Sequence, residues 1–268
     1  MDYISVIKNR RSVRSFNGEP LKKEEIDDLL AFANSVTTPY DQPITWYALD
    51  VEENPKLSST VLRGVKNYLT GKMVLQPKAE EAFGYAFEQV VLYAAEKGIG
   101  TTWIAGTMDR PAFERAIDLK EGEVMPCVSP IGYPAEKMSG REKIMRKGIK
   151  ADSREPFEKL FFDGSFDTPL TEEKAGDLKE ALEAVRLAPS AANKQPWRLV
   201  VTENAVHFYE VPGGFIRNGW DMQKIDIGIA LCHFADVCAQ LGRAVTFSTE
   251  DPGIAAPENV IYIASYTL

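Results

Sequence analysis

Histidine and cysteine, which most often bind transition metals in proteins, are scarce in this chain. The 268 residues include only two histidines, His207 and His233, and three cysteines, Cys127, Cys232 and Cys238. They do not have the spacing of a zinc site, so no metal centre is expected. A small, odd number of cysteines is typical of a reducing compartment rather than of a disulfide scaffold. Cys232 and Cys238 lie in a predicted helix, and we interpret them as small core residues.

Long apolar segments and nucleotide motifs are also lacking. No run approaches the ~20 residues of a membrane span. The N-terminal segment MDYISVIKNRRS has neither the apolar stretch nor the cleavage site of a signal peptide, so a cytoplasmic protein is expected. The chain contains no P-loop, no GxGxxG fingerprint and no GxSxG elbow. The net charge of −8 argues against nucleic acid or an anionic membrane as the main partner.

Positive charge is nevertheless concentrated near the N-terminus. The segment NRRSVRSF, residues 9–16, contains Arg10, Arg11 and Arg14, with Ser12 among them. Arginine is the side chain best suited to bind a phosphate group, because its forked donors make bidentate charge-assisted hydrogen bonds. Two interpretations are open at this point, a solvated helix end and a phosphate-binding site.

Two pairs of segments indicate an internal repeat. GYAFEQVVLYAAEKG, residues 84–98, and GIALCHFADVCAQLG, residues 228–242, both run from one glycine to another with apolar residues at matching positions. Their spacing predicts a helix with a continuous apolar stripe. Residues 24–51 and 176–203 each read as an amphipathic helix, a polar loop containing Gln-Pro, and a strand. We therefore expect an α+β fold made of two repeats, residues 1–160 and 161–268, packed as one globular pseudo-dimer.

Two motifs resemble those of the nitroreductase family. NRRSVRSF resembles its N-terminal flavin-phosphate motif, commonly Arg-x-Ser-x-Arg/Lys before an aromatic residue. APSAANKQPW, residues 188–197, resembles its second motif, Pro-Ser-x-x-Asn-x-Gln-Pro-Trp, at every specified position. In particular, the chain resembles the Thermotoga-type subgroup, in which both halves of the dimer are fused in one polypeptide. The resemblance implies a three-layer α/β/α fold and covers nearly the whole chain.

The resemblance also implies the cofactor, flavin mononucleotide (FMN), and the residues that bind it. In the family the arginine segment of one subunit and the Pro-Ser-x-x-Asn loop of the other share a flavin, while the strand after the long helix supplies small residues near N5. KADSREPF resembles a basic segment of the family with a different spacing, which adds Lys150 and Arg154. The implied cofactor-binding residues are Arg10, Arg11, Ser12, Arg14, Ala105, Gly106, Lys150, Arg154, Pro189, Ser190, Ala191, Asn193 and Gln195. We interpret Pro196 and Trp197 as structural, and leave both roles open for Gln195.

The activity implied by the family is ping-pong hydride transfer from NADH or NADPH, through flavin N5, to a nitroaromatic, quinone or similar small-molecule acceptor. No side chain is assigned as catalytic, because the cofactor performs the redox step. The alternative, a non-enzymatic flavin-binding or storage protein on the same fold, stays open.

The repeat predicts one flavin site per chain. The second-half counterpart of the arginine motif, FFDGSFDTPL, has no arginine, and the first-half counterpart of the second motif, VTTPYDQPI, lacks the serine and the asparagine. Because both losses fall on the same pseudo-symmetric site, only the other site is expected to bind. The fused halves make a monomer the expected state.

Overall fold

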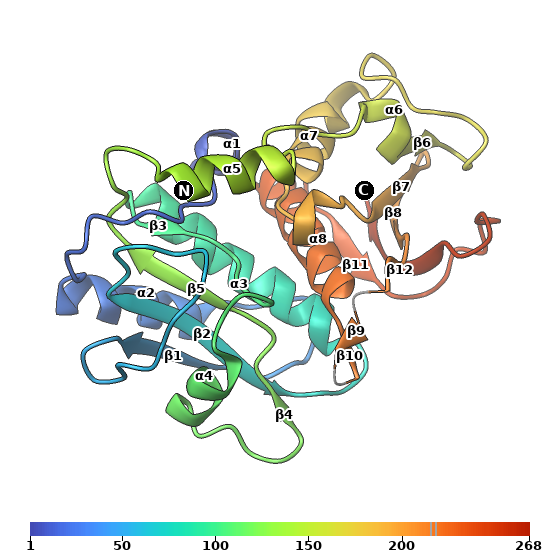
Figure 1. Ribbon diagram of the computed structural model, residues 1–268. Helices are drawn as coiled ribbons and strands as arrows, with labels where there is room; N and C mark the ends of the chain where they lie inside the picture. The colour runs from blue at the N-terminus through green and yellow to red at the C-terminus, as the bar shows by residue number, and fades with distance from the viewer. Residues whose placement is uncertain (215, 218) are drawn as a thin grey trace. The chain divides into compact units, whose positions relative to one another are not determined.

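The computed structural model describes residues 1–214, 216–217 and 219–268 (Figure 1). The chain forms two compact units, each with its own sheet. The first comprises residues 1, 9–79 and 86–151, and the second comprises residues 2–8, 80–85 and 152–268. These units are defined by contacts in space, whereas the division predicted at residue 160 is the boundary between two sequence repeats. That boundary stays a prediction.

The sheet of the first unit has the order β1-β2-β5-β3, with β4 also paired to β2, and all of these pairs are antiparallel. Its strands are β1 (Thr45–Asp50), β2 (Asn67–Val74), β3 (Gly100–Thr101), β4 (Glu123–Val124) and β5 (Val128–Gly132). Strand β2 is buried on both faces except at its last residue, as expected of a central strand.

The helices of the first unit are α2 (Lys23–Ser35), α4 (Arg110–Ala116), α5 (Gly140–Gly148) and most of α3 (Ala79–Glu96), whose residues 80–85 belong to the second unit. At the start of helix α2 the Glu25 side chain accepts a hydrogen bond from the backbone N–H of Lys22. The apolar core includes Tyr68 of β2 and Phe113 of α4, whose rings meet edge to face at 4.9 Å.

The sheet of the second unit has the order β11-β12-β8-β7-β6, antiparallel except for the β6–β7 pair. Its strands are β6 (Phe161–Asp163), β7 (Trp197–Val201), β8 (Ala205–Glu210), β11 (Thr246–Ser248) and β12 (Ile261–Thr267), and a separate hairpin pairs β9 (Ile216–Arg217) with β10 (Trp220–Asp221). All six residues of β8, including His207, are buried.

The helices of the second unit are α1 (Tyr3–Asn9), α6 (Phe157–Leu160), α7 (Lys179–Leu187) and α8 (Met222–Gln240), with short 3-10 turns η1 (Gly176–Leu178) and η2 (Ala191–Asn193). Helix α7 packs against α8 (Figure 1). Helix α8 is buried along most of its length, and both Cys232 and Cys238 are buried, as predicted.

The start of α3, residues 80–85, crosses α8 at two glycines. A Cβ added to Gly84 would lie 2.1 Å from the carbonyl oxygen of Ile225, and one added to Gly228 would lie 2.1 Å from that of Glu81. Only glycine permits such close approach of two helix backbones. The contact is reciprocal, because each glycine meets the carbonyl three residues before the other.

Among the described residues, no helix combines the length and the apolar character that a membrane span requires.

Candidate functional site

The arginine segment of the first unit is extended and is held by its backbone. Val13 donates its backbone N–H to the carbonyl of Thr101 over 2.8 Å, and Ser12 forms a parallel bridge with the same residue. Phe16 donates to the carbonyl of Arg63 over 2.9 Å. This pairing places the arginine segment beside the beginning of residues 101–106, from which two other predicted site residues come.

Arg10 is held against the body of the first unit. Its Nε lies 3.4 Å from Oε1 of Glu88 on α3, and both side chains are buried. The other oxygen of Glu88 accepts a hydrogen bond of 2.9 Å from Nε1 of Trp103. The Glu88 carboxylate therefore balances the charge of Arg10 and fixes its position.

A buried carboxylate also lies beside the other two arginines. Glu142 of α5 is 1% exposed, accepts a hydrogen bond of 2.6 Å from Ser15 Oγ, and lies 3.5 Å from an Nη1 of Arg11. Its charge favours the protonated form of Arg14, whereas the charge of Arg146 opposes it. Four charged side chains, three of them basic, thus influence one another in this region.

Of the three arginines in the segment, Arg14 has the most buried nitrogens without a hydrogen-bond partner among the described residues. It is 6% exposed, and its Nε and Nη1 have no hydrogen-bond partner among the described residues. Burial lowers the pKa of Arg14, which is the direction expected when a cation is removed from water. A buried cation with free donors is costly unless a group of opposite charge completes it.

The segment after β3 presents small residues. Gly106 is exposed, with nothing within 4 Å of where a Cβ would stand. The carbonyl of Ala105 accepts a hydrogen bond of 3.2 Å from Arg110, which also binds the carbonyls of Met125 and Pro126. Arg110 therefore positions the turn that carries Ala105. Sequence reasoning missed this residue, since no motif contains it.

The loop 189–195 of the second unit has an unusual backbone. Ala192, Asn193 and Gln195 have φ values of 49°, 57° and 48°, in the left-handed region that non-glycine residues rarely adopt. Side-chain bonds hold this shape, because Ser190 Oγ accepts the N–H of Gln195 over 2.9 Å and Gln195 Nε2 donates to the carbonyl of Asn193. Strain of this kind tends to accompany binding sites.

Arg154 lies against the same loop. Its Nη1 is 3.4 Å from Oδ1 of Asn193, and Nδ2 of Asn193 donates to the carbonyl of Ser153 over 3.0 Å. Gln195 is buried and its Oε1 accepts the N–H of Glu155, so Gln195 has a structural role in the loop. Trp197 is fully buried at the start of β7.

The structure thus describes the predicted residues in two sets. The first unit contains Arg10, Arg11, Ser12, Arg14, Ala105, Gly106 and Lys150, and the second contains Arg154, Pro189, Ser190, Ala191, Asn193 and Gln195. Lys150 is exposed just after the end of α5.

One carboxyl group beside the loop carries no sequence motif and was missed. Asp226 of α8 accepts the N–H of Ala191 with both oxygens, at 3.1 and 3.0 Å. Burial raises the pKa of Asp226 well above its usual range, and the charge of Glu210 adds to the rise. The only signal in the sequence is an aspartate within the apolar stretch KIDIGIA.

Comparison with known protein families identifies the family of this chain. The family model described as "Putative TM nitroreductase" matches residues 2–237. The chain belongs to this nitroreductase family. A crystal structure from Thermotoga maritima, described as "a putative nitroreductase", shares the fold of this chain. That structure is 18% identical with a TM-score of 0.64, and the match covers 100% of this chain and 93% of that one. The predicted family and the α+β, nitroreductase-like fold are therefore confirmed.

Shorter matches cover about half of this chain. An FMN-dependent nitroreductase from Clostridium difficile is 20% identical over 51% of this chain and 90% of that chain, with a TM-score of 0.43. A "Putative NADH dehydrogenase/NAD(P)H nitroreductase" from Bacteroides thetaiotaomicron is 22% identical over 52% of this chain and 90% of that chain, with a TM-score of 0.44. Among curated proteins, no match was found.

Proposed function

We propose that this nitroreductase-family protein is an FMN-dependent oxidoreductase that uses NADH or NADPH as electron donor. The observation that carries the proposal is the state of Arg14. Its guanidinium is buried, with two nitrogens that have no hydrogen-bond partner among the described residues, inside a segment that resembles a flavin-phosphate motif.

The residues present fit FMN. The phosphate group carries a charge of about −2 near neutral pH and offers several strong acceptors. It would supply both the charge and the acceptors that Arg14 lacks, and would add a partner for Arg11, whose side chain is 36% exposed. Gly106, where a side chain is absent and space is open, suits close approach of a flat ring.

Each set of residues has a proposed task. Arg10, Arg11, Ser12 and Arg14 would bind the phosphate and ribityl oxygens, while Ala105 and Gly106 would face the ring. Ser190, Asn193 and Arg154, held by the strained loop, would orient the flavin with Pro189 and Ala191. Gln195 would act through the loop, because both ends of its amide are engaged within the second unit. Lys150 would add positive charge.

Bound FMN would supply the redox chemistry, the exchange of a hydride between a nicotinamide and an acceptor such as a nitroaromatic or a quinone. The side chains bind and orient, and none is proposed to act as an acid or base.

We also propose that the chain arose by duplication and retains one flavin site. The reciprocal glycine contact between residues 80–85 and α8 has the form of an isologous interface. Strand order supports the same idea, because β1-β2-β5-β3 in the first unit corresponds to β7-β8-β12-β11 in the second. A fused pseudo-dimer of this kind is proposed to be monomeric.

The decisive experiment is anaerobic addition of NADH or NADPH to the purified protein loaded with FMN. We expect the flavin absorbance band at roughly 450 nm to bleach, and to return when a quinone or nitroaromatic is added. Tight FMN binding without bleaching by either donor would instead favour a storage protein.

A further inference from the structure

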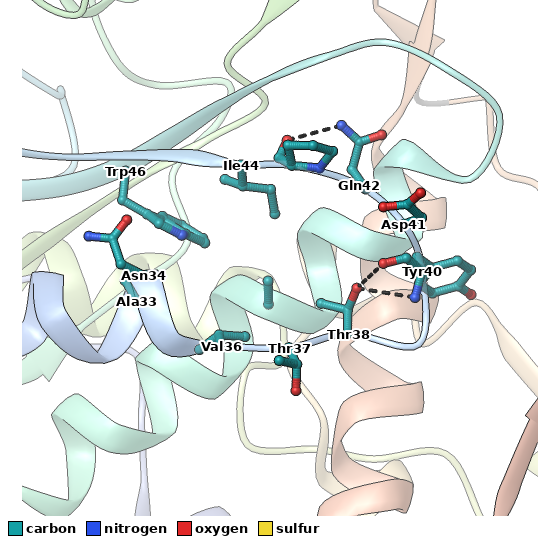
Figure 2. A pocket seen from close by; sticks show the side chains of 12 residues that line it. Ala33, Asn34, Val36, Thr37, Thr38, Tyr40, Asp41, Gln42, Ile44 and Trp46 are labelled. Atoms are coloured by element: carbon teal, nitrogen blue, oxygen red, sulfur yellow. Dashed lines mark hydrogen bonds between the residues drawn. The ribbon is translucent and has the colours of Figure 1, made fainter.

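The loop between α2 and β1 encloses a cavity that the proposed flavin site does not use. It has a volume of about 380 Å³ and is lined by residues of α2, the loop 36–44, β1 and α3, all in the first unit (Figure 2). This volume falls within the range of small-molecule sites. The loop is the first-half counterpart of the predicted flavin loop, but it lacks that loop's serine and asparagine.

One wall of the cavity is apolar and aromatic. Ala33, Ile44 and Ala86 contribute aliphatic surface, and the indole of Trp46 points into the cavity (Figure 2). Trp46 is backed by the ring of Phe87, whose centroid is 5.5 Å away. Such a wall suits the face of a small aromatic ring.

On the opposite side, Gln42 is held in place by hydrogen bonds to the backbone. Gln42 donates its Nε2 to the carbonyls of Pro43 and Val74, at 3.1 and 3.3 Å, so its orientation is fixed. Its Oε1 is buried and has no hydrogen-bond partner among the described residues.

Charge narrows the class of ligand further. Asp41 is the one charged side chain among the described residues that line the cavity, where neither lysine nor arginine occurs. Asp41 is exposed and forms no ion pair within the described part of the chain. Thr38 and Tyr40 bond to each other, with the Thr38 hydroxyl donating to the Tyr40 carbonyl over 2.9 Å, so this side of the loop is preformed. A phosphate or carboxylate would find no cation here.

We propose that this cavity, the aromatic-cation pocket, binds a small aromatic compound that carries a protonated amidine or amine. The ring packs on Trp46, and the N–H groups donate to the Asp41 carboxylate. The proposal does not depend on flavin binding, because all the residues that carry it lie outside the predicted flavin set.

The test uses the full-length protein and two probes of matched shape and opposite charge, benzamidine and benzoate. The indole N–H resonance of Trp46 is identified by its loss in Trp46→Phe and followed in ¹H–¹⁵N spectra during each titration. Benzamidine is expected to shift it with at least roughly fivefold higher affinity than benzoate, in the presence or absence of excess FMN.

Asp41→Asn is the variant that isolates charge, since Asp41 is exposed and its removal leaves the loop bonds of Thr38 in place. Asp41→Asn should lower the affinity for benzamidine about two- to fivefold. The control Glu136→Gln, at an exposed residue, should leave this affinity unchanged. The proposal is overturned if benzamidine leaves the Trp46 resonance unmoved at 10 mM (roughly the limit for so small a probe), if both probes bind equally, or if Asp41→Asn binds benzamidine as the parent does.

Discussion

At the scale of single residues, Arg14 is the group whose environment most clearly lacks a partner. Its buried guanidinium is near Glu142, but that carboxylate is already bound by Ser15 and lies beside Arg11. The charge that Arg14 needs is therefore expected from a ligand.

Arg14→Gln should weaken FMN binding by about 1.5–3 kcal/mol, because it removes a charge-assisted hydrogen bond. The matched control is Arg141→Gln, since Arg141 is exposed and donates to the carbonyl of Thr60 in the same unit. Fluorescence titration with FMN measures both, and equal affinities in the two variants would remove Arg14 from the site. The unfolding free energy of the ligand-free Arg14→Gln protein should not fall, because an unpaired buried cation is lost.

Glu210 is a second buried charged residue whose side chain lacks hydrogen-bond partners among the described residues. It is 1% exposed, and neither carboxylate oxygen has a hydrogen-bond partner among the described residues. Burial raises its pKa from 4.5 to about 7, with further contributions from Asp221, Glu81 and Glu80 that Lys224 partly offsets. The folded state therefore binds more protons than the unfolded state between these two values, and stability falls as pH rises through this window.

Glu210→Gln should remove this loss. We compare the unfolding free energy of the variant with that of the parent at each pH. This difference should be more favourable to the variant at pH 8 than at pH 5 by on the order of 1–3 kcal/mol. Urea unfolding at the two pH values measures the difference, with the exposed Glu136→Gln as control. The same ΔΔG at both pH values would show that Glu210 does not titrate in this window.

At the scale of elements, the crossing of residues 80–85 with α8 depends on two glycines. Gly84→Ala should destabilise the protein by about 2–4 kcal/mol, because the new methyl group would press on a backbone carbonyl that cannot rotate away. Gly228→Ala should have a similar effect, since its contact is the reciprocal one. Thermal and urea unfolding measure both.

The control for this pair is Gly140→Ala in the first turn of α5, where nothing lies within 4 Å of the added Cβ. Alanine favours the helix over glycine by about 1 kcal/mol, so this change should be neutral or stabilising. If Gly84→Ala behaved like Gly140→Ala, the helices would not be in backbone contact at this point.

At the scale of the whole molecule, the two units have unequal site residues. The arginines of the first unit have no counterpart in FFDGSFDTPL, and the loop 36–44 lacks the Ser190 and Asn193 equivalents. We therefore expect one FMN per chain. Flavin absorbance against protein concentration measures this ratio, and a value near two would contradict the loss of the second site.

The family, the fold class and the long helices could be predicted from the sequence. The motif APSAANKQPW and the apolar stripes of residues 84–98 and 228–242 depend on residues close together in the chain, where period and spacing are visible. The glycines that begin both stripes could be noticed as a repeat, but not the carbonyls they meet, because those lie on another helix.

Only the tertiary structure decided which polar groups have partners. Arg10 and Arg14 look alike in NRRSVRSF, yet Arg10 lies against Glu88 with one buried nitrogen unbonded, whereas Arg14 keeps two. Asp226 beneath Ala191, the burial of Glu210 and the cavity beside Trp46 likewise join residues far apart in the chain. Local pattern determines which segment becomes a helix or a strand, but burial, charge balance and cavity shape depend on what packs against each side chain, and that is set by the folded chain as a whole.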